Sequence, residues 1–163
     1  MFSPSPGRST PTIYKWVGSG GLVDLIQIKE YREEEQELSL SHFNDLIYST
    51  KYCWSFKISN GKKSQPIAVC GLREIREGVA EAWMVGSKLL NRHRLFVTKS
   101  IALLLLEHQE VRKEFYRIQA TVRADWETAN KWIKLLGFDY EGYMRQYGSK
   151  REDYIRYARL LWR

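Results

Sequence analysis

The stretch that decides the fold runs from Val122 to Gly142 and reads VRADWETANKWIKLLGFDYEG. It follows residues 116–122, in which apolar and polar side chains alternate as they do in a strand. Within Glu127–Leu136, four apolar side chains share one helical face: Ala129, Trp132, Ile133 and Leu136. Gly137 follows at the position where helices commonly end on glycine. The stretch therefore predicts a strand, an amphipathic helix and a further strand in direct succession.

The rest of the chain extends this alternation of strands and helices. Upstream, three strands joined by tight turns are predicted at residues 52–58, 66–75 and 79–85, with Asn60-Gly61 as the clearest hairpin signal. Other segments complete the pattern: strands at 23–28, 138–146 and 153–161, and helices at 38–52 and 87–109. The predicted order is β-α-β-β-β-α-β-α-β-β. This order indicates an α+β fold with a mixed, largely antiparallel sheet flanked by helices.

The chain of 163 residues has room for one domain of ordinary size. Residues 1–21 are rich in Pro, Ser and Gly and predict an extended arm and joint outside a single domain at 22–163. Cys53 and Cys70 lie in apolar surroundings without metal-ligand spacing, which favours buried free thiols and no metal site. No apolar run is long enough for a membrane span, and the N-terminal residues do not resemble a secretory signal.

The chain is basic, with 26 Lys and Arg against 19 Asp and Glu and a net charge of +7. Basic side chains gather in the last twenty residues: Arg145, Lys150, Arg151, Arg156, Arg159 and Arg163. Two interpretations stay open for this region. It is either a solvated face of one sign or a docking surface, for which nucleic acid is one candidate partner.

The Leu136-Gly137-Phe138 ending, the Glu141-Gly142 step and the order of elements resemble the GNAT superfamily of N-acetyltransferases. The resemblance covers the chain from Val23 to its last residue. It implies a GNAT-like fold, and it implies acetyl-CoA as cofactor if the protein is an enzyme.

One part of the GNAT pattern is absent from the start of the central helix. The family binds the pyrophosphate of the cofactor there with a glycine-rich loop, because glycine lets backbone N–H groups approach phosphate. Leu95 and Val97 stand at the glycine positions, where their side chains are expected to fill the phosphate space. If the cofactor binds, the resemblance leaves its phosphates to the side chains of Arg92, His93, Arg94 and Lys99.

The catalytic positions of the family are altered as well. Trp126 stands where the family often has Asn, and Ile133 stands where it often has the Tyr that protonates the leaving thiolate. For an active enzyme the resemblance suggests Glu81 as general base and Tyr140 or Tyr143 as substitute acids. Each of these three residues is also consistent with an ordinary strand side chain. The altered positions argue against ordinary acetyl transfer.

A narrower resemblance is to acetyltransferase-like internal virion proteins of short-tailed bacteriophages. It is carried by Trp83-Met84-Val85, the basic run 88–99 and Lys134-Leu135-Leu136-Gly137. It implies a catalytically degenerate virion or virion-assembly protein without cofactor, whose partners are other virion proteins and whose location is the virion or the host cytoplasm. Two alternatives remain: an active acetyl-CoA-dependent N-acetyltransferase of unknown amine substrate, and a basic nucleic-acid-binding accessory protein.

Overall fold

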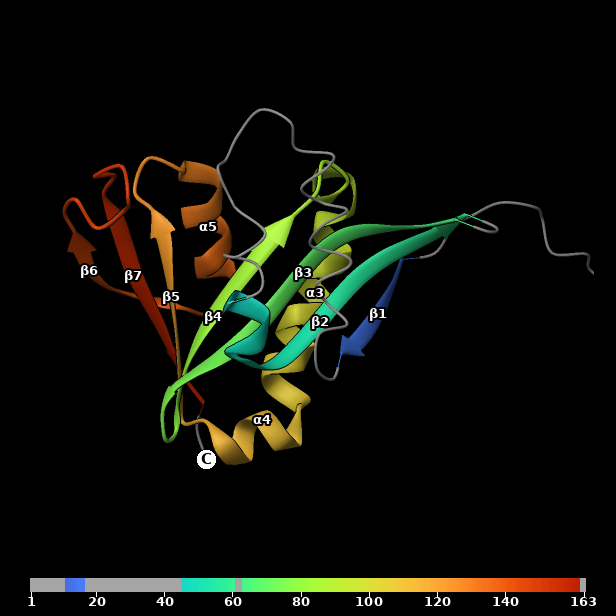
Figure 1. Cartoon of the computed structure of the whole chain (residues 1–163), viewed down its shortest axis with the longest axis horizontal. Helices are drawn as coiled ribbons and strands as arrows, with labels where there is room; N and C mark the ends of the chain where they lie inside the picture. The colour runs from blue at the N-terminus through green and yellow to red at the C-terminus, as the bar shows by residue number, and fades with distance from the viewer. Residues whose placement is uncertain (1–10, 17–44, 61–62, 162–163) are drawn as a thin grey trace, which may run out of the picture. The chain divides into compact units, whose positions relative to one another are not determined.

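The computed structural model describes residues 11–16, 45–60 and 63–161 (Figure 1). Its strands are β1 (Pro11–Trp16), β2 (Thr50–Asn60), β3 (Lys63–Arg76), β4 (Val79–Gly86), β5 (Arg117–Arg123), β6 (Asp139–Met144) and β7 (Tyr154–Leu160). Its helices are α3 (Leu90–Glu107), α4 (Gln109–Glu114) and α5 (Glu127–Leu135). The strand expected at 23–28 and most of the helix expected at 38–52 lie outside the described residues. Residues 45–48, at the end of that expected helix, are helical.

Hydrogen bonds join the strands in the order β1-β2-β3-β4-β5-β7-β6. β1 with β2, β5 with β7 and β6 with β7 are antiparallel pairs, whereas β4 and β5 run parallel. The expected mixed, largely antiparallel α+β fold is confirmed. The short helix α4, which follows the central helix, was not predicted as a separate element. His108 caps it, and Nδ1 of His108 accepts a hydrogen bond from Val111 N at 3.3 Å.

The N-terminal arm needs one correction. Residues 1–12 were expected to lie outside the domain, but β1 pairs along β2 from Pro11 opposite Ile58 to Trp16 opposite Cys53. The alternation of β1 is too short, and its proline too prominent, for the sequence to mark it as a strand. Proline is compatible with an edge strand, and β1 stands at the edge of the strand order. The domain boundary at residue 22 stays a prediction.

The chain divides into two compact units, one made of Met1–Leu72 and Met84–Val97 and the other of Arg73–Trp83 and Thr98–Arg163. In the first unit, Phe56 is fully buried and meets Phe96 of α3 edge to face, with 6.1 Å between the ring centroids. Ile67 and Val69 of β3 are also fully buried. The apolar face of β2 and β3 is therefore the core of this unit.

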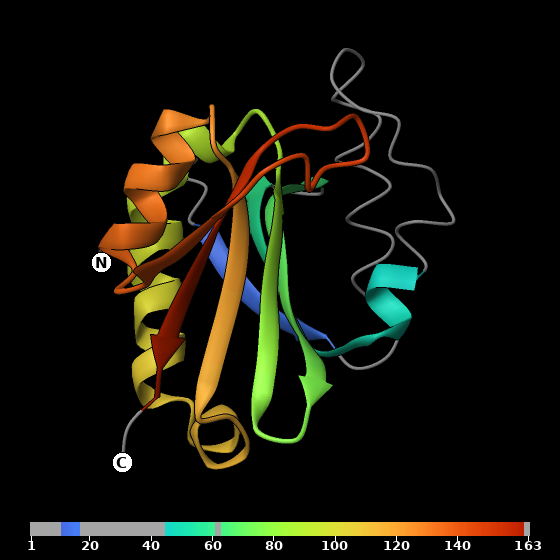
Figure 2. The same ribbon diagram turned by 90° about the vertical axis from the view of Figure 1, so that its left-hand side faces the viewer.

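In the second unit, α5 packs against one face of β5, and Figure 2 shows α5 on that face together with the later turns of α3. Ile118 and Ala120 of β5 are buried there, and so is Ile133 of α5. Trp132 of α5 donates from Nε1 to Thr98 Oγ1 of α3 at 2.7 Å. The stripe predicted for this helix thus faces the sheet, as expected.

Gly137 ends α5 as the sequence predicted. It has a φ of +81°, a left-handed conformation that side chains other than glycine rarely adopt. A Cβ there would also lie 3.1 Å from Nη1 of Arg159 on β7. Both constraints restrict this position to glycine and fix where the chain turns into β6.

From the sequence, Leu95 was expected to face the sheet alongside Ile101 and Leu105, and for Leu95 this prediction is wrong. Its side chain is 72% exposed, whereas Val97, two residues later, is fully buried. Two residues correspond to a rotation of roughly 200° around a helix, so both cannot face the core. The buried positions of α3 are Val97, Ser100 and Leu105, with Ile101 half-buried beside them.

We expect Ile133→Ala to lower the free energy of unfolding by about 2–5 kcal/mol, because it opens a cavity between α5 and β5. Leu135→Ala is the matched control, since Leu135 lies on the same helix and is 76% exposed. It should change stability by no more than about 0.5 kcal/mol. Urea unfolding measures both variants, and equal losses would show that the buried face of α5 is assigned incorrectly.

Candidate functional site

The parallel pair of β4 and β5 is short. Its register consists of Val79 opposite Arg117, Ala80 opposite Ile118 and Glu81 opposite Gln119. Both strands continue beyond it, β4 to Gly86 and β5 to Arg123. β5 remains paired with β7 along its whole length. The edge of β5 that faces β4 is therefore unmatched by β4 from Ala120 onward.

Glu81, the candidate base, occupies the last paired position of β4. Its carboxylate forms an ion pair with Arg73 of β3, and its side chain is 19% exposed. A carboxylate at this point adjoins the place where the two strands stop pairing. It is accessible enough to accept a proton from a ligand there.

The candidate acids lie elsewhere in the same unit. Tyr140 and Tyr143 are on β6, and the strand order places β5 and β7 between β6 and Glu81 on β4. Tyr143 donates from its hydroxyl to Asp153 Oδ2 at 2.8 Å, and this hydrogen bond raises the pKa of the phenol. The structure therefore does not bring either tyrosine together with Glu81.

Neither Ile133 nor Trp126, the two residues at altered family positions, carries a group suited to proton donation. Ile133 is only 7% exposed and belongs to the core under α5. Trp126 forms the N-cap position of α5 without a side-chain cap and is 56% exposed. Neither residue offers a hydroxyl for protonating a leaving group.

The turn from β4 into α3 is held by Ser87. Its Oγ donates to Pro66 O at 2.8 Å and lies 3.1 Å from Ile67 O, while its backbone N–H donates to Ile67 O at 2.8 Å. The same Oγ accepts from Leu89 N at 3.2 Å, and Leu90 N donates to Ser87 O at 3.0 Å. The turn is thereby fixed to β3 and uses several of its own donors.

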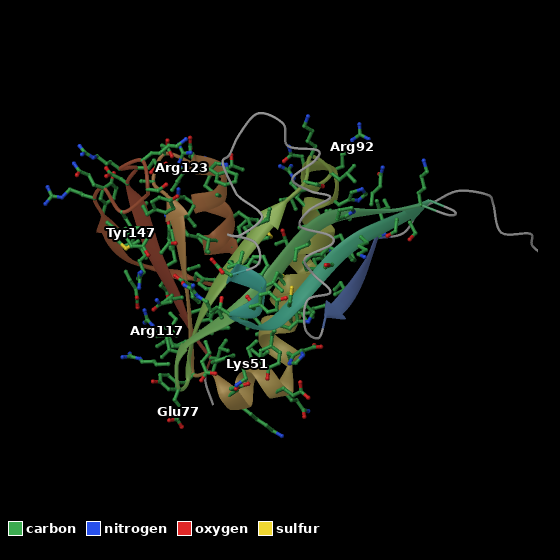
Figure 3. The ribbon with its side chains drawn as sticks, in the orientation of Figure 1. Lys51, Glu77, Arg92, Arg117, Arg123 and Tyr147 are labelled. Carbon is green, nitrogen blue, oxygen red and sulfur yellow. The ribbon has the colours of Figure 1, made fainter. Side chains whose placement is uncertain are left out.

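α3 contains a break three residues after it begins. His93 has φ −114° and ψ 16°, which are not helical values, so the regular helix resumes at Arg94. A helix that starts anew presents N–H groups and a partial positive charge at its first turn. Arg92 and Arg94, on either side of the break, are exposed, and the first turn of α3 carries no acidic residue. Figure 3 labels Arg92 near this end of α3.

Three of the four residues predicted to bind phosphate stand in succession at the break: Arg92, His93 and Arg94. Lys99 is exposed but lies more than a helical turn farther along α3. Of the two residues at the family's glycine positions, Val97 is fully buried and Leu95 is largely exposed. The residues present suit a phosphate group held by side chains and by the start of a helix.

Asn130 was not predicted, although it fixes the turn from β5 to α5. Its Nδ2 donates to Arg123 O and to Trp126 O, both at 2.8 Å, and its Oδ1 accepts from the Tyr157 hydroxyl at 2.8 Å. Burial raises the pKa of Tyr157, so its phenol stays protonated and donates. The available signal was a polar residue on the stripe of α5 that faces the sheet.

No family model matches the sequence, and neither does any curated protein. Solved structures do match. Ard1 from Thermoplasma volcanium superimposes with a TM-score of 0.73 at 13% identity, over 94% of this chain and 99% of that one. An acetyltransferase of the GNAT family from Streptococcus pneumoniae gives 0.65 at 14% identity, over 94% and 100%. The chain has the GNAT fold.

A third match has a protein substrate in its description. The ribosomal-protein-S18-alanine N-acetyltransferase from Escherichia coli gives a TM-score of 0.66 at 18% identity, over 93% of this chain and 94% of that one. At these identities the likeness establishes the GNAT fold, and function rests on the residues of this chain. The described part of the chain holds no group of three or more potential metal ligands, and none of its helices is long and apolar enough to cross a membrane.

The Asn130–Tyr157 hydrogen bond is testable by a double-mutant cycle. We expect Tyr157→Phe and Asn130→Ala each to lower the free energy of unfolding by about 1–3 kcal/mol, because each leaves a buried polar group unpaired. The loss of unfolding free energy in the double variant should be smaller than the sum of the two single losses by at least about 0.5 kcal/mol. Thermal or urea unfolding measures the three variants, and strictly additive losses would contradict the coupling.

Proposed function

We propose that this protein is an acyl-CoA-dependent N-acyltransferase. The observation that carries the proposal is the early end of the β4–β5 pairing at Glu81 and Gln119, while β5 stays paired with β7. An unmatched strand edge suits an extended ligand with amide groups, because backbone N–H and C=O groups need partners. The arm of coenzyme A is such a ligand.

A phosphate-binding role is assigned separately to the cluster at the break of α3, in the first unit. Arg92 and Arg94 supply charge, His93 interrupts the helix, and the first turn after it supplies N–H groups. This arrangement uses charged side chains and does not rely on a glycine-rich loop. Val97, which stands at one of the family's glycine positions, points into the protein and is buried. Binding by side-chain charge implies strong dependence on salt.

The chemistry assigned to this chain is the removal of a proton from the attacking amine. Glu81 is the group proposed to accept it, directly or through a water molecule, and Arg73 holds its carboxylate in place. Bound acyl-CoA would supply a thioester, whose thiol leaving group has a pKa near that of Cys, about 8.5. Such a group can depart as a thiolate without a tyrosine acid.

A second candidate is the non-catalytic virion or virion-assembly protein predicted from the sequence. It is favoured by the buried Ile133 at the usual acid position and by exposed aromatic side chains in the second unit: Trp126, Tyr140, Tyr143 and Tyr147. Exposed aromatics serve as anchors in protein interfaces. Virion partners, and contact of nucleic acid with the basic C-terminal region, stay predictions.

Calorimetric titration with acetyl-CoA tests the first proposal. We expect saturable binding that weakens as salt is raised to about 150 mM, because the proposed contacts to phosphate are ionic. Arg92→Ala/Arg94→Ala should weaken binding at least tenfold. Lys113→Ala/Lys134→Ala removes the same charge from exposed positions on α4 and α5 and should leave affinity unchanged.

Release of free thiol in the presence of a panel of amines then tests catalysis. We expect Glu81→Gln to lower kcat at least tenfold with little change in cofactor affinity, whereas Glu77→Gln, in an exposed turn, leaves kcat unchanged. Saturable binding without transfer to any amine would favour the second candidate. Absence of saturable binding at low salt would contradict the first.

A further inference from the structure

The second unit presents a polar sheet face on the side of β5 opposite α5. Tyr157 points toward α5, where it bonds Asn130, so the alternate residue Arg156 of β7 lies on the other face. The registers place Thr121 opposite Arg156 and Glu81 opposite Gln119. We use the name polar sheet face for Glu81, Arg117, Gln119, Thr121 and Arg156.

Other arginines around this face have carboxylate partners. Arg117 donates to both oxygens of Glu141, the Nη1–Oε1 distance being 2.7 Å, and Arg73 pairs with Glu81. At the end of β5, Arg123 donates from Nε and Nη2 to Asp125, at 3.0 and 2.7 Å. Each of these guanidinium groups therefore has a carboxylate partner within the protein.

Arg156 differs from them. Its Nε is buried and has no hydrogen-bond partner among the described residues. Arg156 does act on one carboxylate through its charge: the Arg117 hydrogen bond, and then the charges of Arg117 and Arg156, lower the pKa of Glu141. Both oxygens of Glu141 are already taken by Arg117. A buried, charged donor without an acceptor is costly, and its retention calls for an explanation.

The structure leaves room beside Arg156. Its partner across the β6–β7 pair is Gly142, which follows an irregularity in the register. A Cβ added at Gly142 would meet no atom within 4 Å. Thr121, with a hydroxyl that can donate, is the partner on β5. Arg156 therefore stands between a residue without a side chain, Gly142, and a residue with a hydroxyl, Thr121.

We propose that Arg156, assisted by Thr121, binds a carboxylate of the amine acceptor. The guanidinium fork matches a carboxylate in two parallel hydrogen bonds, and the open space over Gly142 admits it. Glu81 lies on the same face, two strand spacings across and two residues along the strands, or about 12 Å away. This separation suits an acceptor whose acidic side chain lies within a residue of its reacting amine, as in a peptide with Glu near its N terminus.

The inference deepens the proposed function, but it is tested through binding without acyl-CoA. Tetrapeptide amides with the sequences Ala-Glu-Gly-Gly and Ala-Gln-Gly-Gly are titrated into ¹⁵N-labelled protein and followed by NMR. We expect the Glu peptide to bind saturably, to shift the Arg156 Nε–H resonance and to bind at least tenfold more tightly than the Gln peptide. Equal binding of the two peptides would overturn the proposal.

Variants locate the effect at Arg156. Arg156→Gln should lower affinity for the Glu peptide at least tenfold, and Thr121→Val should lower it severalfold. Arg145→Gln, which removes a charge from an exposed position of the β6–β7 turn, should leave affinity unchanged. A loss with Arg145→Gln equal to that with Arg156→Gln would overturn the proposal, since it would indicate a general charge effect.

Two further readouts separate the alternatives. Arg156→Gln should keep the melting temperature of the wild type, because the donor it removes has no partner to lose. A phosphoserine peptide that binds more tightly than the Glu peptide would overturn the choice of carboxylate. Peptide binding without acyl transfer would contradict the proposed function and leave the Arg156 site intact. Acyl transfer at equal rates to the Glu and Gln peptides would support the proposed function and contradict the Arg156 site.

Discussion

The short pairing between β4 and β5 is the constraint on which the functional account depends. Parallel strands in a sheet satisfy each other's backbone groups, yet here the register ends after Glu81 opposite Gln119. β5 does not end there, because β7 accompanies it to Arg123. The sheet therefore contains an unmatched strand edge beyond that point. A ligand that supplies amide groups can satisfy such an edge, and this is the reason for proposing an elongated cofactor.

Two local devices hold the surroundings of this edge. Asn130 joins the backbone at Arg123 and Trp126 to the Tyr157 hydroxyl, so the end of β5, the start of α5 and the middle of β7 are fixed together. Ser87 fixes the turn after β4 to the backbone of β3. Both devices use buried or half-buried hydrogen bonds rather than surface ion pairs, and these resist salt.

The sequence predicted the elements from β2 to β7 because their patterns are local. Alternation marks the strands, the stripe through Ile133 marks α5, and Gly137 marks its end. It failed at positions decided by tertiary contacts. No proline or glycine marks the break at His93 in the sequence. The central helix was therefore treated as continuous, and Leu95 was expected to face the core. β1 acquires its strand conformation by pairing with β2, which no local pattern reveals.

The candidate site was predictable in part for the same reason. The family resemblance pointed to the basic residues around the start of α3, whereas the separation of Tyr140 and Tyr143 from Glu81 follows from the strand order. In the order β5-β7-β6, the last strand of the chain inserts between two earlier ones. The isolation of Arg156 is likewise a result of its neighbours, since it depends on Arg117 occupying both oxygens of Glu141.

The central claim is that the unmatched edge of β5 after Glu81 and Gln119 receives the arm of coenzyme A. Amide hydrogen exchange of the wild-type protein, with and without saturating coenzyme A, tests it most directly. The account predicts slower exchange along β5 from Ala120, with no change at the tip of the β6–β7 turn. Unchanged exchange at all of these amides in the presence of bound coenzyme A would contradict it.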